Sequence, residues 1–473
     1  MDIRTRALNP PSFRPLLWLV GVAVFMQTLD TTIVNTALPS MAVSLGESPL
    51  RMQAVVISYA LTLAMLIPAS GWLSDRVGTR RVFVAAVVVF TTGSLACAMS
   101  RQLRWLVAAR VLQGVGGAML LPVGRLAVLR ALPREEFLPA MSFVTVPGLV
   151  GPLVGPTLGG WLVQTASWHW IFLINVPLGI VGGLAAMRLM PDLRAPVSRF
   201  DLLGYLLLAF GMVAVSFSLN VLSERPQYGV GLVLLVFGLA ALVAYWLHAA
   251  RADRPLFPLA LFKVHSFSVG ILGNLFSRVG SGGMPYLIPL LLQVGLGYSP
   301  MHAGMMMIPA AAAGIFSKRI VVPLVQRVGY RRVLVGNTLL VGLAMISFAL
   351  VAPGRPIWMY ALQFAAFGCV NSLQFTAMNT LALSDLAGDL ASGGNSLLSM
   401  VMMLAMSLGV AVAAALLAGF GGTEAGIGHG TLGAFRGSFV CAGLVTMASA
   451  AIFAQLEPTN RIPEATVKEA SAG

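Results

Sequence analysis

The sequence places one acidic side chain deep within an apolar segment. Asp30 lies in the apolar run from Leu16 to about Ala37, which also holds Gln27 and Asn35. A carboxylate inside a membrane costs at least roughly 2.5 kcal/mol, so it is rarely kept without a function. We therefore predict that Asp30 binds and releases a proton. A permanent structural pairing with an arginine is the alternative.

Arg110 is the basic side chain best placed to meet Asp30. Asp30 lies 14 residues beyond Leu16, roughly 21 Å along a helix, which leaves about 9 Å to the far edge of an apolar core roughly 30 Å thick. Arg110 lies 6 residues beyond Arg104 in a run of opposite direction, also about 9 Å from that edge. The two charges can meet if their helices are neighbours, and Gln113 shares the helical face of Arg110. A cation bonded only to carbonyl groups is the alternative for Arg110.

A loop between two apolar runs combines glycines, one carboxylate and several arginines. Its residues are Gly71, Asp75, Arg76, Gly78, Arg80 and Arg81. We predict a tight turn at Gly78, a carboxylate at a helix end and basic groups at the membrane face. A plain basic loop would explain the arginines but not Gly71 and Asp75. The segment 326–333 repeats 75–82 at six of eight positions, with Gln326 in place of Asp75.

The run 148–160 carries small residues at a spacing of four. One set comprises Gly151, Gly155 and Gly159, and an adjacent set comprises Gly148, Pro152, Pro156 and Gly160. Small residues let two helices approach closely, and prolines bend a helix. We therefore predict a tightly packed, bent helix that can serve as part of a gate.

Further polar side chains inside the apolar runs are candidates for lining a substrate pocket. They are Gln27, Asn35, Gln113, Asn175, Asn274, Arg278, Gln363, Asn371 and, with less support, Gln374. Arg278 is the one charge within a run of the second half, and several glycines follow it. A pocket cation and an arginine bonded to the carbonyl groups of a broken helix both fit this pattern. Hydrogen bonds between helices are the alternative for the amides.

The composition requires a membrane around these segments. Of 473 residues, 58% are hydrophobic and 10% are charged, whereas a soluble protein carries about a quarter charged residues. Apolar runs long enough to cross a bilayer recur along the chain. They predict an all-α polytopic protein with fourteen spans, at 16–38, 51–73, 82–100, 104–125, 137–161, 168–190, 201–221, 228–248, 266–292, 299–324, 332–352, 357–383, 396–419 and 436–456.

Lysine and arginine are unevenly distributed over the connecting segments. With the N-terminus in the cytoplasm, 22 of the 30 fall on the cytoplasmic side and 6 on the other side, while Arg110 and Arg278 fall within spans. Because cytoplasmic loops are enriched in these residues, we predict that both termini are cytoplasmic and that the number of spans is even. The net charge of +14 has the same explanation, so no nucleic-acid partner is expected.

The repeated loop divides the chain into two similar halves. We predict six-helix bundles at 1–190 and 256–460, an inserted two-helix linker at 191–255 and a short cytoplasmic tail at 461–473.

One cytoplasmic loop differs from the others in charge. The loop between the twelfth and thirteenth predicted spans carries Asp385 and Asp389 but neither lysine nor arginine. We hypothesise that it faces a basic loop across the closed cytoplasmic gate, with a merely solvated acidic loop as the alternative.

These motifs resemble those of the major facilitator superfamily. The segments 71–81, 110–118 and 148–160 resemble its loop, fourth-span and antiporter signatures. The segments 29–39 and 168–179 resemble the first and sixth spans of its fourteen-span drug:proton antiporter branch. The resemblance implies the major facilitator fold, two pseudo-symmetric six-helix bundles plus an inserted hairpin, in the bacterial inner membrane.

The same resemblance implies roles for individual residues. It implies that Asp75 helps to hold the two halves together, that Arg110 takes part in proton coupling and that transport runs outward. The leading hypothesis is therefore a proton-coupled exporter that works by alternating access, with multidrug efflux as its activity. Its partners would be the lipid bilayer, protons and a small-molecule substrate, and the protein would be a monomer.

Other functions remain open. Because the spans hold one acid and two arginines, an exporter of an anionic metabolite or of a metal chelate, such as a metal–carboxylate complex, is the main alternative. An uptake symporter and a membrane sensor are weaker hypotheses. The sequence contains no Gly-rich loop for ATP and no evident catalytic or zinc constellation. We therefore expect no enzyme activity, no metal and no cofactor, with the proton gradient as the energy source.

Overall fold

The computed structural model describes residues 13–132, 134–195, 199–222, 228–386, 389–421 and 430–457, and these form helices without any strand. The expected all-α fold class is thus confirmed. Among the described residues, twelve helices are long and apolar enough to cross a membrane. The fourteen spans remain a prediction, because the segment after His265 is broken and the helix at 357–384 is not one of the twelve.

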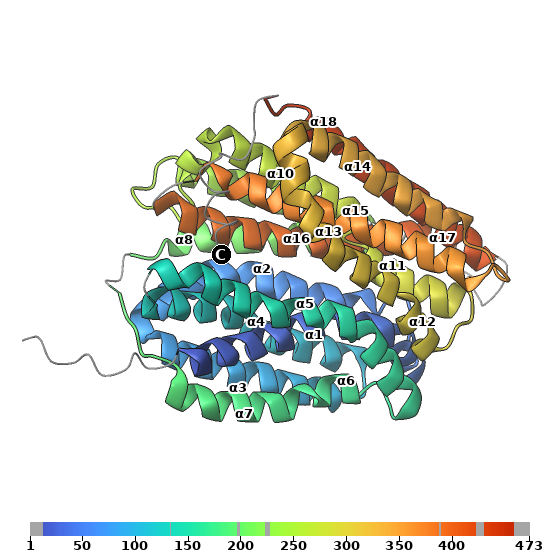
Figure 1. Cartoon of the computed structure of the whole chain (residues 1–473), viewed down its shortest axis with the longest axis horizontal. Helices are drawn as coiled ribbons and strands as arrows, with labels where there is room; N and C mark the ends of the chain where they lie inside the picture. Colours follow the sequence, from blue (N-terminus) through green and yellow to red (C-terminus); the bar gives the residue numbers. More distant parts are fainter. Residues whose placement is uncertain are drawn as a thin grey trace, which may run out of the picture.

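The first part of the chain forms one bundle (Figure 1, lower half). Its helices are α1 (Arg14–Leu45), α2 (Gln53–Val77), α3 (Thr79–Ala98), α4 (Leu103–Ala131), α5 (Arg134–Thr165), α6 (Trp170–Leu173) and α7 (Asn175–Leu189). The helix α1 packs against α4 and α5, and α3 packs between α4 and α7. This arrangement makes the helices that carry Asp30 and Arg110 neighbours.

A helical hairpin follows the first bundle. The helices α8 (Leu202–Leu222) and α9 (Tyr228–Ala249) pack on each other, and α8 also contacts α2 and α16. Many large hydrophobic side chains of this hairpin are exposed, among them Phe210, Phe217 and Phe237. Such a surface is stable only against lipid or another apolar partner.

The remaining helices form the upper half in Figure 1. They are the 3₁₀ turn η2 (Leu259–Lys263), α10 (His265–Ser281), α11 (Met284–Leu290), the π-helical turn η3 (Leu291–Gly295), α12 (Pro300–Met306), α13 (Ile308–Val328), α14 (Tyr330–Ser347), the 3₁₀ turn η4 (Phe348–Leu350), α15 (Ile357–Ser384), α16 (Asp389–Gly421), α17 (Gly430–Ala448) and α18 (Ala450–Phe453). The helix α10 packs against α15, α16 and α17.

The two copies of the repeated motif adopt the same local structure. Gly78 links α2 to α3 with φ 103°, and Gly329 links α13 to α14 with φ 87°. Each glycine amide donates to the carbonyl four residues earlier, and each glycine then starts the next helix. Only glycine adopts these angles at little cost, so the repeat marks equivalent helix–turn–helix junctions in the two halves.

The segment 266–292, which we predicted as one span, is not a single helix. It breaks after Ser281, where Gly282 and Gly283 approach the backbone of α16 at Gly409. A Cβ on Gly283 or Gly409 would overlap with the facing chain, and one on Gly282 would overlap with the Arg278 carbonyl of its own helix. The break therefore follows from close packing of α10 and α11 on α16, which the hydropathy pattern does not encode.

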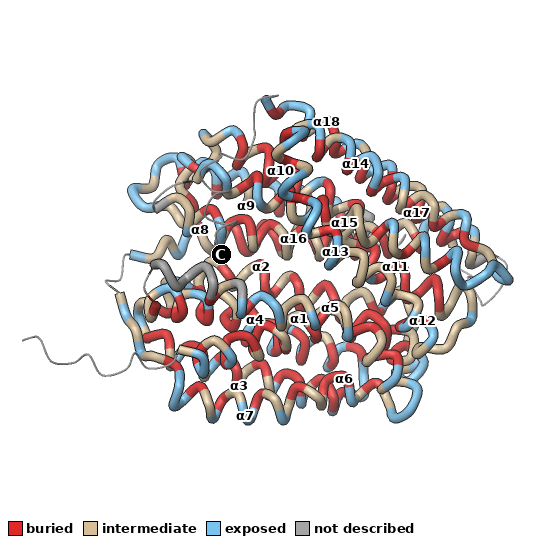
Figure 2. Tube along the Cα trace, viewed as in Figure 1, coloured by how far each residue is buried: buried red, intermediate tan, exposed pale blue. Residues whose placement is uncertain are grey.

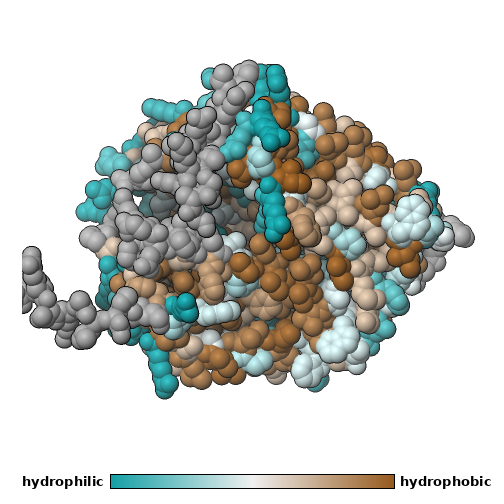
Figure 3. All heavy atoms as spheres, viewed as in Figure 1, coloured by the Kyte–Doolittle hydropathy of each residue, from teal (hydrophilic) through white to brown (hydrophobic). Residues whose placement is uncertain are grey.

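The surface matches the burial pattern expected of a membrane protein. Buried residues lie on the sides of helices that face one another, and exposed residues gather in the loops at the two ends (Figure 2). On the face in Figure 3, hydrophobic residues cover the middle of the molecule and hydrophilic residues gather toward its ends. We call the end at which α1 begins, near Arg14, the proximal end, and the end at which α1 finishes, near Leu45, the distal end.

Candidate functional site

Asp30 and Arg110 form an ion pair inside the first bundle. Arg110 Nη1 donates to Asp30 Oδ2 at 2.6 Å, and the two side chains are 2% and 0% exposed. The structure thus brings together the two charges that the depth estimate placed at one level. Since each ion loses its hydration on burial, the pair is stable only if further polar groups replace the lost water.

Neighbouring polar groups supply that replacement. Asp30 Oδ1 accepts from Gln113 Nε2 at 2.8 Å and from Asn175 Nδ2 at 3.4 Å. Arg110 donates to Gln113 Oε1 at 2.6 Å through Nη1 and to the Val55 carbonyl at 3.2 Å through Nε. The pair is therefore bonded from α1, α2, α4 and α7, so a change in either charge is felt by four helices.

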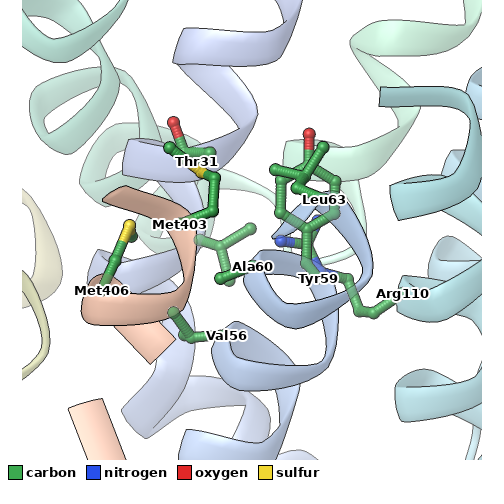
Figure 4. A pocket seen from close by; sticks show the side chains of 9 residues that line it. Thr31, Val56, Tyr59, Ala60, Leu63, Arg110, Met403 and Met406 are labelled. Atoms are coloured by element: carbon green, nitrogen blue, oxygen red, sulfur yellow. The ribbon is translucent and has the colours of Figure 1, made fainter. Parts of the chain in front are cut away.

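Tyr59 covers the guanidinium on the side of the second half. Its ring centroid lies 4.1 Å from Arg110 Cζ, and Figure 4 shows the ring in front of the arginine nitrogens. A small cavity of about 10 Å³, room for roughly one water, adjoins this point, and Met403 and Met406 of α16 line its other side. The Tyr59 ring thus separates the ion pair from the opposite half, whose Met403 and Met406 face it across the cavity.

The small-residue stripes of α5 face two different partners. Gly151, Gly155 and Gly159 pack against Thr28, Thr32 and Ile33 of α1, where an added Cβ would overlap with each. Pro156 and Gly160 belong to the adjacent stripe and meet Gly304 and Pro300 of α12, backbone against backbone. Gly148 also faces α1, at Val24, whereas Pro152 is exposed. One stripe therefore holds the first bundle together, and the other joins it to the second.

The polar contacts between the described residues of the two halves lie at the distal end. Thr157 Oγ1 donates to the Gly304 carbonyl at 3.3 Å, and the Met301 amide donates to Gln164 Oε1 at 3.3 Å. Gln293 Nε2 donates to the Thr36 carbonyl at 2.8 Å. The turn η3 and the helix α12 carry these contacts, and α12 lies at this end in Figure 1. The described halves are therefore joined distally by α1, α5, η3 and α12.

The α5–α12 contact gives a first test. Gly304→Ala should push α12 away from Pro156, because the added Cβ would overlap with that carbonyl. We expect a lower disulfide yield between Gln164→Cys and Met301→Cys in a background without the native cysteines. Gly336→Ala, which has open space around it, should leave the yield unchanged. An unchanged yield in Gly304→Ala would show that the close approach is not needed for distal closure.

The loop motif is ordered by contacts within the first half and its linker. Asp75 Oδ1 accepts from Arg130 Nη2 of α4 at 2.6 Å, so its partner belongs to the same half and not to the opposite one. Arg80 Nε donates to the Met190 carbonyl at 2.5 Å, and Arg76 lies over the Trp72 ring. Gly71 and Arg81 are exposed. Among the described residues, the ion pair of Asp75 is with Arg130, and the role of Asp75 in holding the two halves together stays a prediction.

Two of the four amides predicted for the pocket of the second half join helices instead. Gln363 Nε2 donates to Ser347 Oγ at 2.9 Å, and Gln374 bonds to Asn337 and Thr338 of α14. Asn371 is half-buried. The alternative of helix–helix hydrogen bonding therefore applies to Gln363 and Gln374.

Arg278 retains an unused donor. Its Nε donates to Asn274 Oδ1 at 3.2 Å and its guanidinium lies 4.4 Å from the Phe375 ring, but its buried Nη2 bonds to no group among the described residues. The sequence allowed two interpretations of Arg278, a pocket cation and an arginine bonded to the carbonyl groups of a broken helix. Among the described residues, no bond of Arg278 to such a carbonyl group is seen. Gln27 Oε1 and Asn35 Oδ1 are likewise buried without a partner in the described part of the chain.

Sequence reasoning missed three members of these polar clusters. Tyr59 and Ser94 were not selected, although Ser94 Oγ accepts from Gln113 Nε2 at 2.7 Å. The third is His248, whose Nε2 lies 2.8 Å from Asp201 Oδ1 at the base of the hairpin. Burial raises the pKa of Asp201, yet hydrogen bonds from His248 and two backbone amides outweigh it, so the pKa is lowered overall. A tyrosine, a serine and a lone histidine carry no spacing signal that would have identified these contacts.

Two predictions concern the loop before α16. Asp385 is exposed, whereas the side chain of Asp389 lies outside the described residues. The hypothesis that this loop faces a basic loop across a closed gate stays a prediction.

Among the described residues no group of three or more His, Cys, Asp or Glu could hold a metal ion.

Comparison with known proteins identifies similar sequences over nearly the full length. The family model of the Major Facilitator Superfamily matches residues 20–410. A protein of Serratia proteamaculans is 51% identical over 464 residues, which cover 97% of this chain and 96% of that protein. A protein of Citrobacter koseri is 52% identical over 473 residues, which cover 98% of this chain and 97% of that protein. Both are named "Putative multidrug resistance protein MdtD".

Solved structures share the fold at low sequence identity. A POT family transporter in complex with 5-aminolevulinic acid superposes with a TM-score of 0.68 at 14% identity, covering 94% of this chain and 95% of that one. A bacterial homolog of the human lysosomal transporter Spinster, in an inward-facing and unoccupied conformation, gives 0.66 at 17% identity, covering 94% and 97%. These likenesses establish the fold and not the substrate.

Proposed function

Since the chain belongs to the Major Facilitator Superfamily and is a membrane transporter, we propose that it exports small molecules in exchange for protons by alternating access. The observation that carries this proposal is the fully buried Asp30–Arg110 pair beside the boundary between the halves. Carboxylates within membrane spans typically mark proton or ion pathways, so Asp30 is suited to carry a proton. The proton gradient, without a cofactor, would supply the energy.

The charge balance of the pair suggests how a proton acts. With Asp30 ionised, the buried cluster is neutral, and Arg110 donates to Asp30, to Gln113 and to the Val55 carbonyl. A proton on Asp30 would leave the guanidinium as an uncompensated buried charge, which is strongly unfavourable. The helices α1, α2, α4 and α7 would then favour another arrangement. Protonation would thereby bias the equilibrium between two conformations of the bundle.

The substrate class is proposed from two observations. The relatives carry a multidrug resistance name, and Met403 and Met406 provide an adaptable apolar wall next to Tyr59. Methionine suits binding sites that accept varied shapes. The unused donor of Arg278 favours the second candidate, an exporter of an anionic metabolite or metal chelate, although the names of the relatives do not.

We also propose a topology. If the segment from α10 to η3 and the helix α15 cross the membrane as well, the count of spans becomes fourteen. The distribution of arginine and lysine then places the proximal end and both termini in the cytoplasm, in a bacterial inner membrane. The bundles 1–190 and 256–460, the linker 191–255 and the tail 461–473 would form one monomer.

The test is proton release from purified protein in weakly buffered detergent. Tetraphenylphosphonium, a dicarboxylate and a tricarboxylate, the last two with and without a divalent metal, would be added in turn. Release on addition of the lipophilic cation supports drug:proton exchange. Release only with a carboxylate or its metal complex moves the assignment to the second candidate. If substrate binds without proton release in any case, the coupling proposal is wrong.

A further inference from the structure

A hollow between α3 and α4 lies outside the transport machinery. It measures about 660 Å³ and opens on the outer surface of the first bundle at the distal end. Ala96, Ala108, Ala109 and Leu112 form its apolar walls, and Arg101 and Trp105 stand at the end nearest the loop. From this geometry we infer that the hollow binds a phospholipid with an anionic headgroup.

The size and position of the hollow suit a lipid. Small side chains on the facing helices create the space, and Trp105 is 61% exposed beside it. An exposed tryptophan at a helix end typically marks the level of lipid headgroups. An acyl chain would therefore run from that level along Ala108 and Leu112 toward the middle of the membrane.

The charge at the rim selects the headgroup. Arg101 is exposed and forms no ion pair within the described residues. Arg104 is held by a hydrogen bond from its Nε to Gln102 Oε1 at 2.7 Å, and its guanidinium lies 5.7 Å from the Trp105 ring. Arginine binds phosphate oxygens with two parallel hydrogen bonds. Two arginines without a carboxylate partner therefore favour an anionic lipid over a zwitterionic one.

The location makes these arginines unusual. Under the proposed topology the loop between α3 and α4 faces away from the cytoplasm, on the side where lysine and arginine are rare. Arg101 and Arg104 concentrate two cations in four residues there. The hollow also lies on the face of α4 away from the Asp30–Arg110 pair, because Ala108 and Leu112 line it and are exposed, whereas Arg110 and Gln113 are buried. The proposal is thus independent of the transported substrate.

Native mass spectrometry of the purified full chain tests the proposal directly. The protein would be titrated with phosphatidylglycerol or phosphatidylcholine. We expect the wild type to bind phosphatidylglycerol preferentially. In the double variant Arg101→Gln/Arg104→Gln the affinity for phosphatidylglycerol should fall roughly fivefold for each arginine removed. Arg355→Gln, which removes an exposed charge from another distal loop, is the matched control and should bind as the wild type does. Equal binding of both lipids by the wild type would overturn the proposal, as would unchanged binding in the double variant or an equal loss in the control.

A second measurement locates the bound lipid. In phosphatidylcholine vesicles that contain a minor fraction of phosphatidylglycerol brominated on its acyl chains, quenching of tryptophan fluorescence should fall in Trp105→Phe. The same quenching in Trp105→Phe and in the wild type would place the lipid elsewhere and contradict the assignment.

Discussion

Replacing Asp30 with asparagine should abolish proton-driven export while leaving substrate binding in place. The amide keeps the size of the side chain and can still accept from Gln113, but it cannot take up or release a proton. Efflux from proteoliposomes with an imposed proton gradient should fall to the level of empty vesicles. Binding measured by tryptophan fluorescence should persist, since the proposed apolar wall of Met403 and Met406 is left unchanged.

The control for this variant is Glu47→Gln. It makes the same change of carboxylate to amide at a distal residue whose contact is an ion pair with Arg51 outside the coupling cluster. Full proton-driven export by Asp30→Asn would refute Asp30 as the proton carrier. If both variants lose export to the same degree, the loss is not specific to the buried carboxylate of Asp30.

Replacing Arg110 with glutamine should destabilise the protein strongly. The change leaves the Asp30 carboxylate buried without its cation, and breaking such a pair from one side costs about 3–5 kcal/mol. Thermal unfolding in detergent should occur at a clearly lower temperature than in the wild type. The control Arg355→Gln changes an exposed position and should unfold at the same temperature as the wild type.

The double variant separates stability from coupling. In Asp30→Asn/Arg110→Gln neither charge is left unpaired, so much of the lost stability should return. Proton-driven export should remain absent, because no carboxylate is present. If the double variant is less stable than Arg110→Gln alone, the two residues do not interact as the 2.6 Å contact implies.

The Asp30–Arg110 pair could be predicted from the sequence because the sequence gives the depth of each charge in the membrane. Charges inside apolar runs are few, and helix rise converts residue number into height, so Asp30 and Arg110 could be placed at one level. Their lateral neighbours could not be derived in this way. Ser94 and Tyr59 approach the pair through the packing of α2 and α3, which depends on the shapes of many side chains.

The bundle of long helices and its internal repeat could also be predicted from the sequence. The interruption after Ser281 and the packing partners of α5 could not. Hydropathy detects long apolar helices, and the glycine of the repeated loop is needed at Gly78 and Gly329 for the same backbone reason. The interruption after Ser281 arises from contact with α16, a partner far away in the chain. For the same reason, the spacing of small residues in α5 identified a packing surface without telling which stripe meets α12.

The contact of α5 with α12 has a consequence for the speed of the transport cycle. Pro156, Gly160, Pro300 and Gly304 have no side-chain rotamers to lose, so joining these surfaces costs almost no side-chain conformational entropy. Separating them exposes little apolar side-chain area, so the opposing cost is small as well. The α5–α12 contact can thus form and dissolve at little cost in either of these two terms. A junction of interlocking leucines would hold more tightly and would slow every turnover.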